Sequence, residues 1–565
     1  MNPESSEFWQ HPFRFGTKSV RGRFLIPSGI RCTRASTIEW CFEHVPSVGV
    51  VTTKSISLSP RAGYVEPIYA RYAVDSYINA VGLANPGAEQ FCRELKRIRV
   101  PADKFLLVSI FGGNAKQFVD TALALREVAD GFELNMSCPH AEGYGVEIGQ
   151  NKDLVAEITA EVARATRLPV IVKLSAVVGD VGQTAKAAVN AGAAGVTVTN
   201  TIGPATVSYR DTPLLSNRVG GLSGTGIRPL GLRAVKRVRD ALGPGPVLIG
   251  MGGISTAGDV RQFQSAGADL LGVGSALTGM NSRKMRSYFA SMDKALRSTT
   301  TRQSRPVGLP QVTMGYSPAR IAGREEYYPG LFKLLLNELP IKGLTGELAG
   351  RYFFLCIPGV GEKPFAVFSA EERSIVVKVV GRFTEYLSKL SAGSEVLLRG
   401  PYGQPFPRLE GRTVVLVGGG TGIASLLEIG KLLRERNRLR FLLGGRSAGD
   451  LFGLSEFSAL GPVQASTNDG SAGHPGFVTG LLSEWLASPP AVEKPVYVLC
   501  GPEAMVEACF ELLLPHADPQ EIWGSIEYIT SCGVGICGKC ACPSGLLTCI
   551  DGPFLQFPAF RRRRG

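Results

Sequence analysis

The first 297 residues alternate short apolar runs with segments of helical periodicity. Eight runs rich in β-branched and apolar residues predict strands, and stretches such as KDLVAEITAEVARATR between them carry apolar residues at helical spacing. Near-continuous hydrophobic strands that alternate with helices are typical of a parallel sheet covered on both faces. Eight such units predict an α/β fold, a (β/α)8 TIM barrel, with an open doubly wound sheet as the alternative. The predicted strands are residues 22–29, 49–55, 105–112, 131–137, 169–175, 195–201, 246–253 and 270–276.

Polar residues gather at the carboxyl ends of these runs, and this is the face of a TIM barrel that carries the active site. Three glycine-rich turns, GGLSGTGIRP (220–229), GMGGIS and GVGSA, follow in the order expected for phosphate-binding loops. Their backbone N–H groups can approach a phosphate closely. The segment ELNMSCPHAEGYG (133–145) presents Asn135, Cys138 and His140 at the end of a strand. The pattern therefore predicts a phosphate site and an exposed thiol at one end of the barrel.

The pattern changes after residue 297. The stretch STTTRQSRPVGLP is polar, basic and punctuated by proline, which predicts a linker. Short alternating strands follow and predict a small antiparallel β-barrel. The stretch RTVVLVGGGTGIASLLEI then reads as strand, glycine-rich turn and helix, the order that dinucleotide pyrophosphate binding requires. We predict a barrel domain at 1–297, a linker at 298–311, an antiparallel β-barrel at 312–408, an α/β nucleotide-binding domain at 409–518 and a cysteine-rich segment at 519–565.

The stretch SCGVGICGKCACPSGLLTC spaces four cysteines as C-x4-C-x2-C-x8-C. The first three repeat the plant-type [2Fe–2S] spacing, and the glycines between them free backbone N–H groups to point at sulfur. Four thiolates also make a closed tetrahedral zinc site, which is the alternative. The predicted ligands are Cys532, Cys537, Cys540 and Cys549; Cys542 is the spare, with no ligand role.

Composition and charge restrict which partners and which cellular location we expect for the protein. The chain has 61 Lys and Arg against 48 Asp and Glu, a net charge of +13, which fits an enzyme that binds phosphorylated cofactors as well as one with an anionic partner. No nucleic-acid-binding signature occurs, and the basic run Arg561–Arg564 reads as a solvated tail. No signal-peptide pattern and no apolar run near the ~20 residues of a membrane span occurs, so we expect a cytoplasmic protein without a membrane partner. Twelve cysteines in that setting indicate metal or catalysis before disulfides.

Seven motifs together resemble the dihydroorotate dehydrogenases: NAVGLANPG (79–87), TKSISLSPRAG (53–63), LNMSCPH, VKLS, TNT, GGLSG and GMGGI. The closest match is the soluble class that works with an iron–sulfur flavoprotein partner. The resemblance implies oxidation of dihydroorotate to orotate in pyrimidine biosynthesis, with Cys138 as the base, and a homodimer through the barrel. The implied FMN contacts are Ser28, Lys54, Ser55, Asn135, Lys173, Thr199, Gly224, Gly252, Gly253, Gly274 and Ser275. The implied substrate contacts are Lys54, Asn79, Ala80, Val81, Gly82, Leu83, Asn135, Asn200 and Thr201.

The residue types agree with this chemistry. A flavin accepts the hydride, and a side chain must take the proton. A thiol, with an unperturbed pKa of about 8.5 that nearby cations lower, suits that role near neutrality. Asparagine amides match the alternating C=O and N–H edge of a pyrimidine ring. Lys54 suits the substrate carboxylate, the flavin or both.

Three departures from the family pattern leave alternatives open. His140 stands where the family usually has asparagine, and the dihydropyrimidine dehydrogenases share this change, because their motif also reads SCPH. Ser109 stands where a flavin-contacting asparagine is common. KLSAV replaces the usual KLSPN. A dihydropyrimidine dehydrogenase or reductase is therefore the first alternative. The second, from another class, is a redox relay that docks to a partner protein.

Residues 312–560 resemble ferredoxin-reductase-like proteins, in particular the electron-transfer subunit that partners the dehydrogenase. The resemblance implies FAD, a [2Fe–2S] cluster and NAD, with electrons leaving FMN through the cluster and FAD to NAD⁺. In KPFAVFS, Lys363 replaces the arginine of the FAD motif and loses its bidentate fork, and Ala366 replaces a serine. The implied FAD contacts are Lys363, Pro364, Phe365, Ala366, Val376, Val377, Lys378, Phe383 and Thr384.

The same resemblance places the nicotinamide nucleotide on the glycine-rich turn. The implied contacts are Gly418, Gly419, Gly420, Thr421 and Gly422, framed by TNDGS (467–471) and CGPEAM (500–505). Cys500 either lies near the nicotinamide or packs in the core. Arg446 and Ser447 follow a strand, where they would meet a 2′-phosphate or solvent, so NAD and NADP both stay open.

Overall fold

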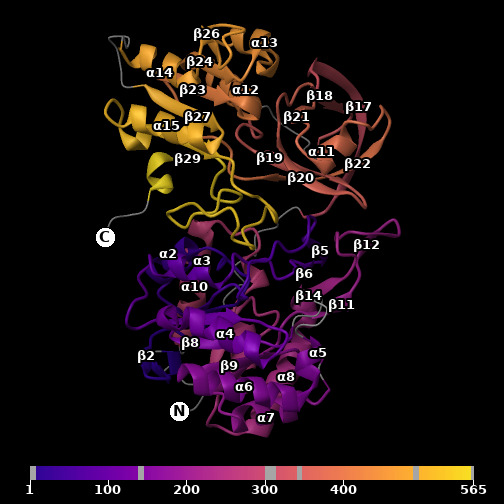
Figure 1. Cartoon of the computed structure of the whole chain (residues 1–565), viewed down its shortest axis with the longest axis vertical. Helices are drawn as coiled ribbons and strands as arrows, with labels where there is room; N and C mark the ends of the chain where they lie inside the picture. Colours follow the sequence, from indigo (N-terminus) through magenta and orange to yellow (C-terminus); the bar gives the residue numbers. More distant parts are fainter. Residues whose placement is uncertain are drawn as a thin grey trace. The chain divides into compact units, whose positions relative to one another are not determined.

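The structure is a computed structural model that describes residues 8–9, 11–137, 146–177, 179–298, 314–339, 346–487 and 495–561. Its internal contacts divide the chain into two compact units. Unit 1 consists of Met1–Val312 and Val534–Ala541, and unit 2 consists of Thr313–Gly533 and Cys542–Gly565. Figure 1 shows the elements of both units by label and colour.

Unit 1 is a closed barrel of eight parallel strands, which follow one another around the barrel in chain order. Each predicted strand overlaps one of them, so the TIM-barrel prediction is confirmed. The strands are β3 (Phe24–Ile26), β4 (Val48–Thr52), β7 (Phe105–Ile110), β8 (Gly131–Asn135), β9 (Val170–Leu174), β10 (Gly195–Val198), β15 (Val247–Met251) and β16 (Leu270–Gly272).

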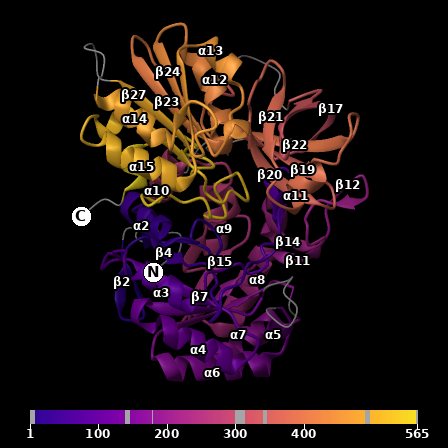
Figure 2. The same ribbon diagram turned by 45° about the horizontal axis from the view of Figure 1, so that its top comes forward.

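A helix follows each barrel strand and covers its outer face (Figure 2). The helices are α2 (Ala35–His44), α3 (Ala88–Leu95), α4 (Ala115–Leu125), α6 (Lys152–Thr166), preceded by α5 (Val146–Gln150), α7 (Val181–Asn190), α8 (Arg228–Leu242), α9 (Ala257–Ser265) and α10 (Ser282–Arg297), with 3₁₀ turns η1 (Arg126–Val128), η2 (Thr225–Ile227) and η3 (Ser275–Leu277). Side-chain oxygens of Asn114, Asn151, Asp180, Thr256 and Asn281 accept hydrogen bonds from first-turn N–H groups of α4, α6, α7, α9 and α10. These N-caps determine where the helices begin.

A small antiparallel sheet is inserted beside the barrel strands, and the sequence did not predict it. Its strand order is β11 (Ile202–Ala205), β14 (Gly220–Gly224), β6 (Ser76–Asn79) and β5 (Tyr69–Ala73), and β12 (Ser208–Tyr209) pairs with β13 (Thr212–Pro213) nearby in the chain. The GGLSG stretch, predicted as a turn, is therefore a strand. A Cβ added at Gly224 would lie 2.1 Å from the carbonyl oxygen of Asp75, so this close pairing requires glycine.

A hairpin of β1 (Phe13–Phe15) and β2 (Lys18–Val20) closes the amino end of the barrel. Phe15 is fully buried and stacks on Phe105, the first residue of β7, with 4.2 Å between ring centroids. Phe15 and Val20 share one core cluster with inward residues of the barrel strands, such as Leu25 and Ile171. The hairpin therefore completes the barrel core from below.

We expect Phe15→Ala to lower the free energy of unfolding of unit 1 by about 3–5 kcal/mol, because it leaves a cavity under the barrel. Urea unfolding of the full chain measures the change. Phe13→Ala is the matched control, because Phe13 lies on the same strand and is only partly buried. Equal losses for the two variants would contradict the proposed role of Phe15.

Unit 2 contains a half-barrel and a nucleotide-binding type of sheet. Six antiparallel strands follow the order β20 (Gly361–Ala366), β19 (Tyr352–Ile357), β22 (Glu395–Tyr402), β17 (Ser317–Tyr328), β18 (Leu331–Leu336) and β21 (Ser374–Lys378). The end strands β20 and β21 contact each other, so the sheet curls into a half-barrel, with α11 (Arg382–Leu387) beside β20. The predicted antiparallel architecture is present.

The second sheet of unit 2 has seven strands, and its six neighbouring pairs are parallel except for the last. Its order is β26 (His474–Pro475), β25 (Val463–Thr467), β24 (Arg438–Gly445), β23 (Thr413–Gly419), β27 (Val496–Gly501), β28 (Ile522–Ile526) and β29 (Leu555–Gln556). The helices are α12 (Ile423–Leu433), α13 (Leu454–Ser458), α14 (Val478–Ala487) and α15 (Glu503–Leu513), with 3₁₀ turns η4 (Gly420–Gly422), η5 (Ala448–Asp450), η6 (Pro519–Glu521) and η7 (Phe557–Phe560). The predicted α/β class is confirmed for both units.

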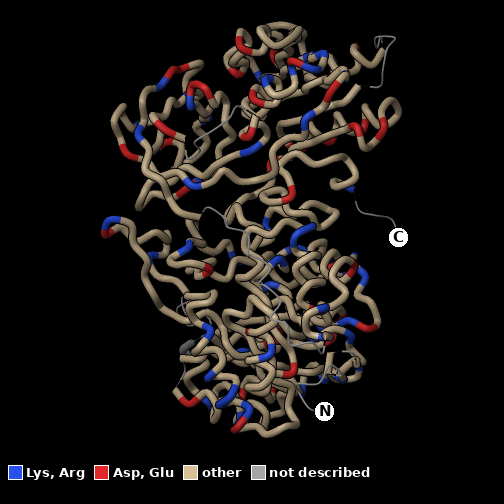
Figure 3. Tube along the Cα trace, turned by 180° about the vertical axis from the view of Figure 1, so that it is seen from behind, with Lys and Arg blue, Asp and Glu red and all other residues tan. Residues whose placement is uncertain are grey.

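Charged residues of both signs are interspersed along each unit (Figure 3). Exposed helices carry ion pairs such as Arg93 with Glu89 and Lys116 with Asp120, each at 2.6 Å. Among the described residues, no helix combines the length and the apolar character that a membrane crossing needs.

Candidate active site

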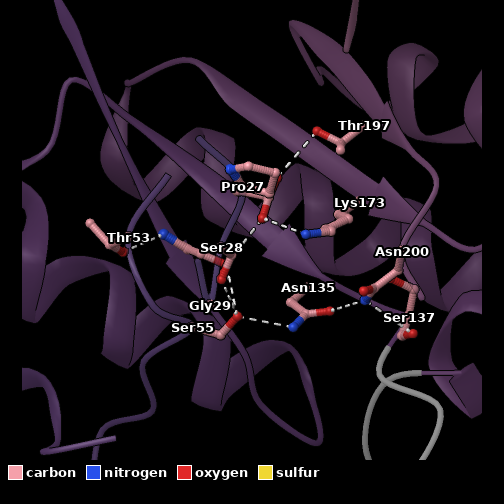
Figure 4. A network of polar contacts seen from close by, with 12 residues as sticks. Pro27, Ser28, Gly29, Thr53, Ser55, Asn135, Ser137, Lys173, Thr197 and Asn200 are labelled. Carbon is pink, nitrogen blue, oxygen red and sulfur yellow. Dashed lines mark hydrogen bonds and ion pairs between the residues drawn. The ribbon is translucent and has the colours of Figure 1, made fainter. Parts of the chain in front are cut away.

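Four predicted site residues from four different barrel strands meet at the carboxyl ends (Figure 4). The Ser55 hydroxyl is the centre: its oxygen lies 3.0 Å from Ser28 Oγ, and Asn135 Nδ2 donates to it at 3.0 Å. Asn200 Nδ2 donates to Asn135 Oδ1 at 3.4 Å. Parallel strands end at the same face of a barrel, so the fold brings together residues that are far apart in the chain.

Both predicted lysines are buried at this face, with Lys54 8% and Lys173 3% exposed. Lys173 stands opposite Asn135 in the pairing of β9 with β8, and its Nζ lies 3.6 Å from Glu133 Oε1. Lys54 Nζ reaches over the next loop, 3.9 Å from where a Cβ at Gly29 would lie. The site therefore holds two ammonium groups with little access to water.

The two predicted threonines are tied to the same strand end. Thr199 Oγ1 accepts from the N–H of Ala176 at 2.7 Å and donates to the carbonyl of Asn200 at 3.0 Å. The N–H of Thr201 donates to Asn200 Oδ1 at 2.8 Å. Asn200 is thus held from both sides of its amide.

A small, partly open pocket lies where β15 and β16 end. A Cβ at Gly253 would lie 2.7 Å from the carbonyl oxygen of Gly224, so these two predicted glycine turns approach backbone to backbone. Thr225 and Tyr77 were not predicted; the signal for Thr225 was its place directly after Gly224. Hydroxyls and Cβ-free backbone at this end suit a phosphate group. The lining residues are Asp75, Tyr77, Thr225, Gly253, Ile254, Ser255, Ser275 and Ala276.

The predicted substrate segment, residues 79–83, leaves β6 as a braced loop. Gly82 and Leu83 both have positive φ angles, of 70° and 55°. Arg61 Nε donates to the carbonyl of Gly82 at 2.9 Å, and the N–H of Tyr64 donates to the carbonyl of Val81 at 3.2 Å. The TKSISLSPRAG and NAVGLANPG motifs therefore form one connected wall.

Cys138, the predicted base, and His140 lie outside the described residues. The residue before them, Ser137, is fully buried, and its hydroxyl and carbonyl accept from Asn200 Nδ2 at 3.0 and 3.3 Å. Ser137 is therefore itself part of the polar network.

A second thiol, Cys32, also lies near the barrel mouth. It accepts from the N–H of Gly29 at 3.0 Å and donates to the carbonyl of Pro27 at 3.6 Å. Burial raises the pKa of Cys32 to about 11, although Lys54 opposes the change. Cys32 therefore stays protonated at neutral pH and is no general base.

Sequence reasoning missed Glu133, whose side chain is 0% exposed. Ser109 Oγ donates to its Oε1 and Thr197 Oγ1 donates to its Oε2, both at 3.2 Å. The available signal was a carboxylate within an apolar strand, two positions before Asn135 and hence on the same face.

Comparisons with known proteins find relatives of the barrel region. The family model described as dihydroorotate dehydrogenase matches residues 15–287. The dihydroorotate dehydrogenase B (NAD(+)) catalytic subunit of Pyrococcus abyssi is 45% identical over 235 residues, which is 41% of this chain and 77% of that protein. The chain belongs to the dihydroorotate dehydrogenase family.

One further relative and one solved structure are also similar to parts of this chain. The corresponding catalytic subunit of Thermococcus kodakarensis is 42% identical over 260 residues, 46% of this chain and 84% of that protein. A solved structure described as an NADH-dependent reduced ferredoxin-NADP oxidoreductase covers 43% of this chain and 90% of its own, at 27% identity and a TM-score of 0.37. The dihydroorotate dehydrogenase assignment rests on the barrel.

In unit 2, the predicted FAD residues lie on β20, β21 and α11. The ring centroids of Phe365 and Phe383 lie 6.5 Å apart. The side chains of Val376 and Val377 pack in the core, so only their backbone can face a ligand. Lys378 Nζ pairs with Asp450 Oδ1 at 2.7 Å.

Thr384, another predicted FAD residue, is engaged at the start of α11. Its hydroxyl oxygen accepts from the N–H groups of Val380 and Gly381 at 3.0 and 3.2 Å, and the hydroxyl donates to the carbonyl of Gly381 at 2.9 Å. The side chain therefore shapes the turn before the helix.

The predicted strand–turn–helix for a dinucleotide is present as β23, η4 and α12. A Cβ at Gly422 would lie 2.5 Å from the carbonyl oxygen of Cys500, and one at Gly419 would lie 2.3 Å from Met505 Sδ, so GGGTG and CGPEAM pack together. The neighbours β24 and β27 lie on opposite sides of β23, which makes its carboxyl end a topological switch point.

The residues that frame this switch point are also placed. The N–H of Asp469, in TNDGS, donates to the carbonyl of Arg446 at 3.1 Å, so the two loops meet. Cys500 packs in the core, and burial raises its pKa to about 11. Core packing was one of its two predicted positions.

The five cysteines between 532 and 549 are all buried. Cys542 packs in an apolar core with Phe510 and Leu555, and none of the other four belongs to that cluster. The carbonyl of Cys532 accepts from Arg399 Nη1 at 3.0 Å within unit 2. In unit 1, the carbonyls of Ile536 and Cys537 accept from the N–H of Arg31 at 2.8 Å and from Thr33 Oγ1 at 2.5 Å.

Across the ranges that the structure describes, no group of three or more His, Cys, Asp or Glu side chains is arranged to hold a metal ion. The four-cysteine cluster site therefore stays a prediction. The chemistry of the segment suits it, because the thiols are buried and the glycines between them have positive φ angles of 76° at Gly533, 72° at Gly535 and 71° at Gly538.

Proposed function

We propose that the protein oxidises dihydroorotate to orotate, with FMN held by unit 1 and Cys138 as the base. The observation that carries the proposal is the joined network of Ser28, Ser55, Asn135 and Asn200 beside two buried lysines, in a chain of this family. Amide groups and ammonium groups are the partners that a carboxylated pyrimidine needs.

The residues at the barrel mouth fit FMN, which the family implies. The pocket beside Gly253 and Ser275 would take the phosphate, and the Ser55 network with Lys173 would face the ring system. FMN, when bound, supplies the hydride acceptor. The residues that would hold it are Ser28, Lys54, Ser55, Asn135, Lys173, Thr199, Gly224, Gly252, Gly253, Gly274 and Ser275.

The substrate would be oriented by the chain's own polar groups. Lys54 binds the carboxylate, Asn135 and Asn200 bind the ring edge, and the wall formed by residues 79–83 excludes water. Cys138 takes the proton from the ring carbon as a thiolate. Ser137, the residue before it, accepts a hydrogen bond from Asn200 Nδ2 at 3.0 Å.

We further propose that unit 2 conducts the electrons to NAD⁺. FAD would lie on β20, β21 and α11, the nicotinamide nucleotide on residues 418–422, and a [2Fe–2S] cluster on Cys532, Cys537, Cys540 and Cys549. The cluster would carry one electron at a time, and the flavins would connect it to the two-electron reactions of the substrate and the nicotinamide. The hydrogen bonds that anchor residues 536 and 537 within unit 1 support an exit that begins at the barrel. We expect a homodimer through the barrel.

An anaerobic absorbance titration of the purified protein tests both proposals. We expect dihydroorotate to bleach flavin and iron–sulfur absorbance and NAD⁺ to restore it, with no response to dihydrouracil. Bleaching by dihydrouracil alone would transfer the assignment to dihydropyrimidines. Reduction by NADH but by neither pyrimidine would refute the substrate and leave the role of unit 2 intact.

A further inference from the structure

The buried carboxylate of Glu133 lies one layer below the predicted ligand-binding amides. Glu133 and Asn135 are two positions apart on β8, so both point into the barrel. Three donors surround the carboxylate: Ser109 and Thr197 hydroxyls at 3.2 Å and the Lys173 ammonium at 3.6 Å. A buried charge needs such partners, and here each of them is itself buried.

The carboxylate determines the direction of the hydrogen bonds above it. A carboxylate only accepts hydrogen bonds, so Ser109 donates its single hydroxyl proton to Glu133. Ser109 Oγ also lies 3.0 Å from Ser55 Oγ, and it can therefore only accept from Ser55. Ser55 in turn has no proton left, so it accepts from Asn135 Nδ2 and from Ser28, each at 3.0 Å.

The same logic continues to the second amide. With its Nδ2 turned to Ser55, Asn135 presents Oδ1 to Asn200 Nδ2 at 3.4 Å. Asn200 Nδ2 also donates to Ser137, and Asn200 Oδ1 accepts from the N–H of Thr201 at 2.8 Å. Every member of the chain is then satisfied with one amide orientation at each asparagine.

We propose that Glu133 is a positioning residue. Through Ser109 and Ser55 it determines whether the Oδ1 or the Nδ2 group of each amide is directed at the substrate. Among the residues that the structure describes, one N–H of Asn135 and one lone pair of Asn200 Oδ1 remain for a ligand, together with the lone pairs of Ser28. This pattern matches a ring edge that alternates C=O with N–H. The inference rests on the proposed function for the identity of that ligand.

Ser109→Ala and Thr197→Val form a matched pair that tests the proposal. Each removes one hydroxyl from Glu133, but only Ser109 continues to Ser55 and Asn135. We expect Ser109→Ala to raise the dissociation constant of orotate by about fivefold to tenfold, as the loss of an oriented hydrogen bond does, and Thr197→Val to change it by less than about twofold. Flavin absorbance shifts report orotate binding without turnover.

Glu133→Gln retains the shape but can donate as well as accept, so the direction of the chain is lost. We expect it to weaken orotate binding by about tenfold or more, with KM for dihydroorotate rising more than kcat falls. The thermal unfolding midpoints of the three variants distinguish a positioning role from a structural one. If Glu133 acted only through stability, the variants with the lowest midpoints would also bind orotate most weakly. Should Glu133→Gln fail to fold, the matched pair alone decides.

Wild-type orotate binding in Ser109→Ala, or equal losses in Ser109→Ala and Thr197→Val, would overturn the proposal. If the unaltered protein does not bind orotate, the proposed substrate fails, and the inference is then tested by FMN. The dissociation constant of FMN, measured by fluorescence on reconstitution of the apoprotein, should rise in Ser109→Ala and Glu133→Gln but not in Thr197→Val, because Asn135 is also a predicted FMN contact.

Discussion

Replacing Arg399 with methionine is expected to lower the free energy of unfolding of unit 2 by about 3–5 kcal/mol, because it strands a buried carboxylate. Arg399 and Glu362 are 1% and 0% exposed, and they form a bidentate pair at 2.9 and 2.5 Å. The guanidinium also donates to Tyr402 Oη at 3.0 Å. Tyr316 Oη donates to Glu362 at 2.8 Å, so the charge pair lies inside a closed polar cluster.

The pKa values of Arg399 and Tyr316 are both shifted by their places in this cluster. Burial by itself would lower the pKa of Arg399, but Glu362 and the two tyrosines reverse this and raise that pKa well above its ordinary value. Burial, followed by the charge of Glu362, raises the pKa of Tyr316 well above its ordinary value. The guanidinium therefore stays charged and the tyrosine neutral throughout the pH range in which the protein would be studied.

Urea unfolding of the full chain measures the loss. The control is Glu362→Leu with Arg399→Met, since replacing both charges by apolar groups is often neutral in a protein interior. We expect the double variant to recover most of the stability. Equal losses for the single and double variants would show that the pair itself stabilises the fold.

Arg399 also donates to the carbonyl of Cys532, a predicted cluster ligand. The single variant should therefore also reduce the iron content of the purified protein. Arg436→Ala, which removes an exposed ion pair with Glu410 in the same unit, should change neither stability nor iron content appreciably.

Replacing Cys138 with alanine is expected to slow flavin reduction by dihydroorotate about 10²–10⁴-fold, because the step loses its general base. Stopped-flow absorbance under anaerobic conditions measures that half-reaction alone. Reduction of the same protein by NADH should keep its rate, since the proposed base takes no part in it. A normal dihydroorotate rate in Cys138→Ala would place the base elsewhere.

Cys32→Ala is the matched control for this test. Cys32 lies near the same barrel mouth, but burial raises its pKa to about 11, and it is no base at neutral pH. We expect little change in the rate of flavin reduction. Cys138→Ser should retain part of the activity, with a rate that increases towards higher pH than in the unaltered protein, because a hydroxyl ionises less readily than a thiol.

The local pattern of the chain was sufficient for the barrel and for the dinucleotide turn. Near-continuous apolar runs predicted all eight barrel strands, and polar residues at their ends predicted where Ser28, Ser55, Asn135 and Asn200 would meet. These features depend on periodicity and on strand direction, which neighbouring residues determine. The strand–turn–helix at residues 413–433 was predictable for the same reason.

Other features depended on residues that only the closed fold brings together. Gly220–Gly224 became a strand because β6, far away in the chain, lies close enough to pair with it. Val376 and Val377 turn their side chains into the core of unit 2, so that only their backbone can face the FAD that the sequence resemblance implies.

The Glu133 network is the clearest case of what tertiary structure decided. By itself the sequence determined that Glu133 lies on a strand, on the same face as Asn135, in a barrel of eight strands. Its partners Ser109, Lys173 and Thr197 come from three other strands, and no local pattern relates them. Closure of the barrel sets those distances, and the distances decide which hydroxyl must donate to which, and so which way each amide points.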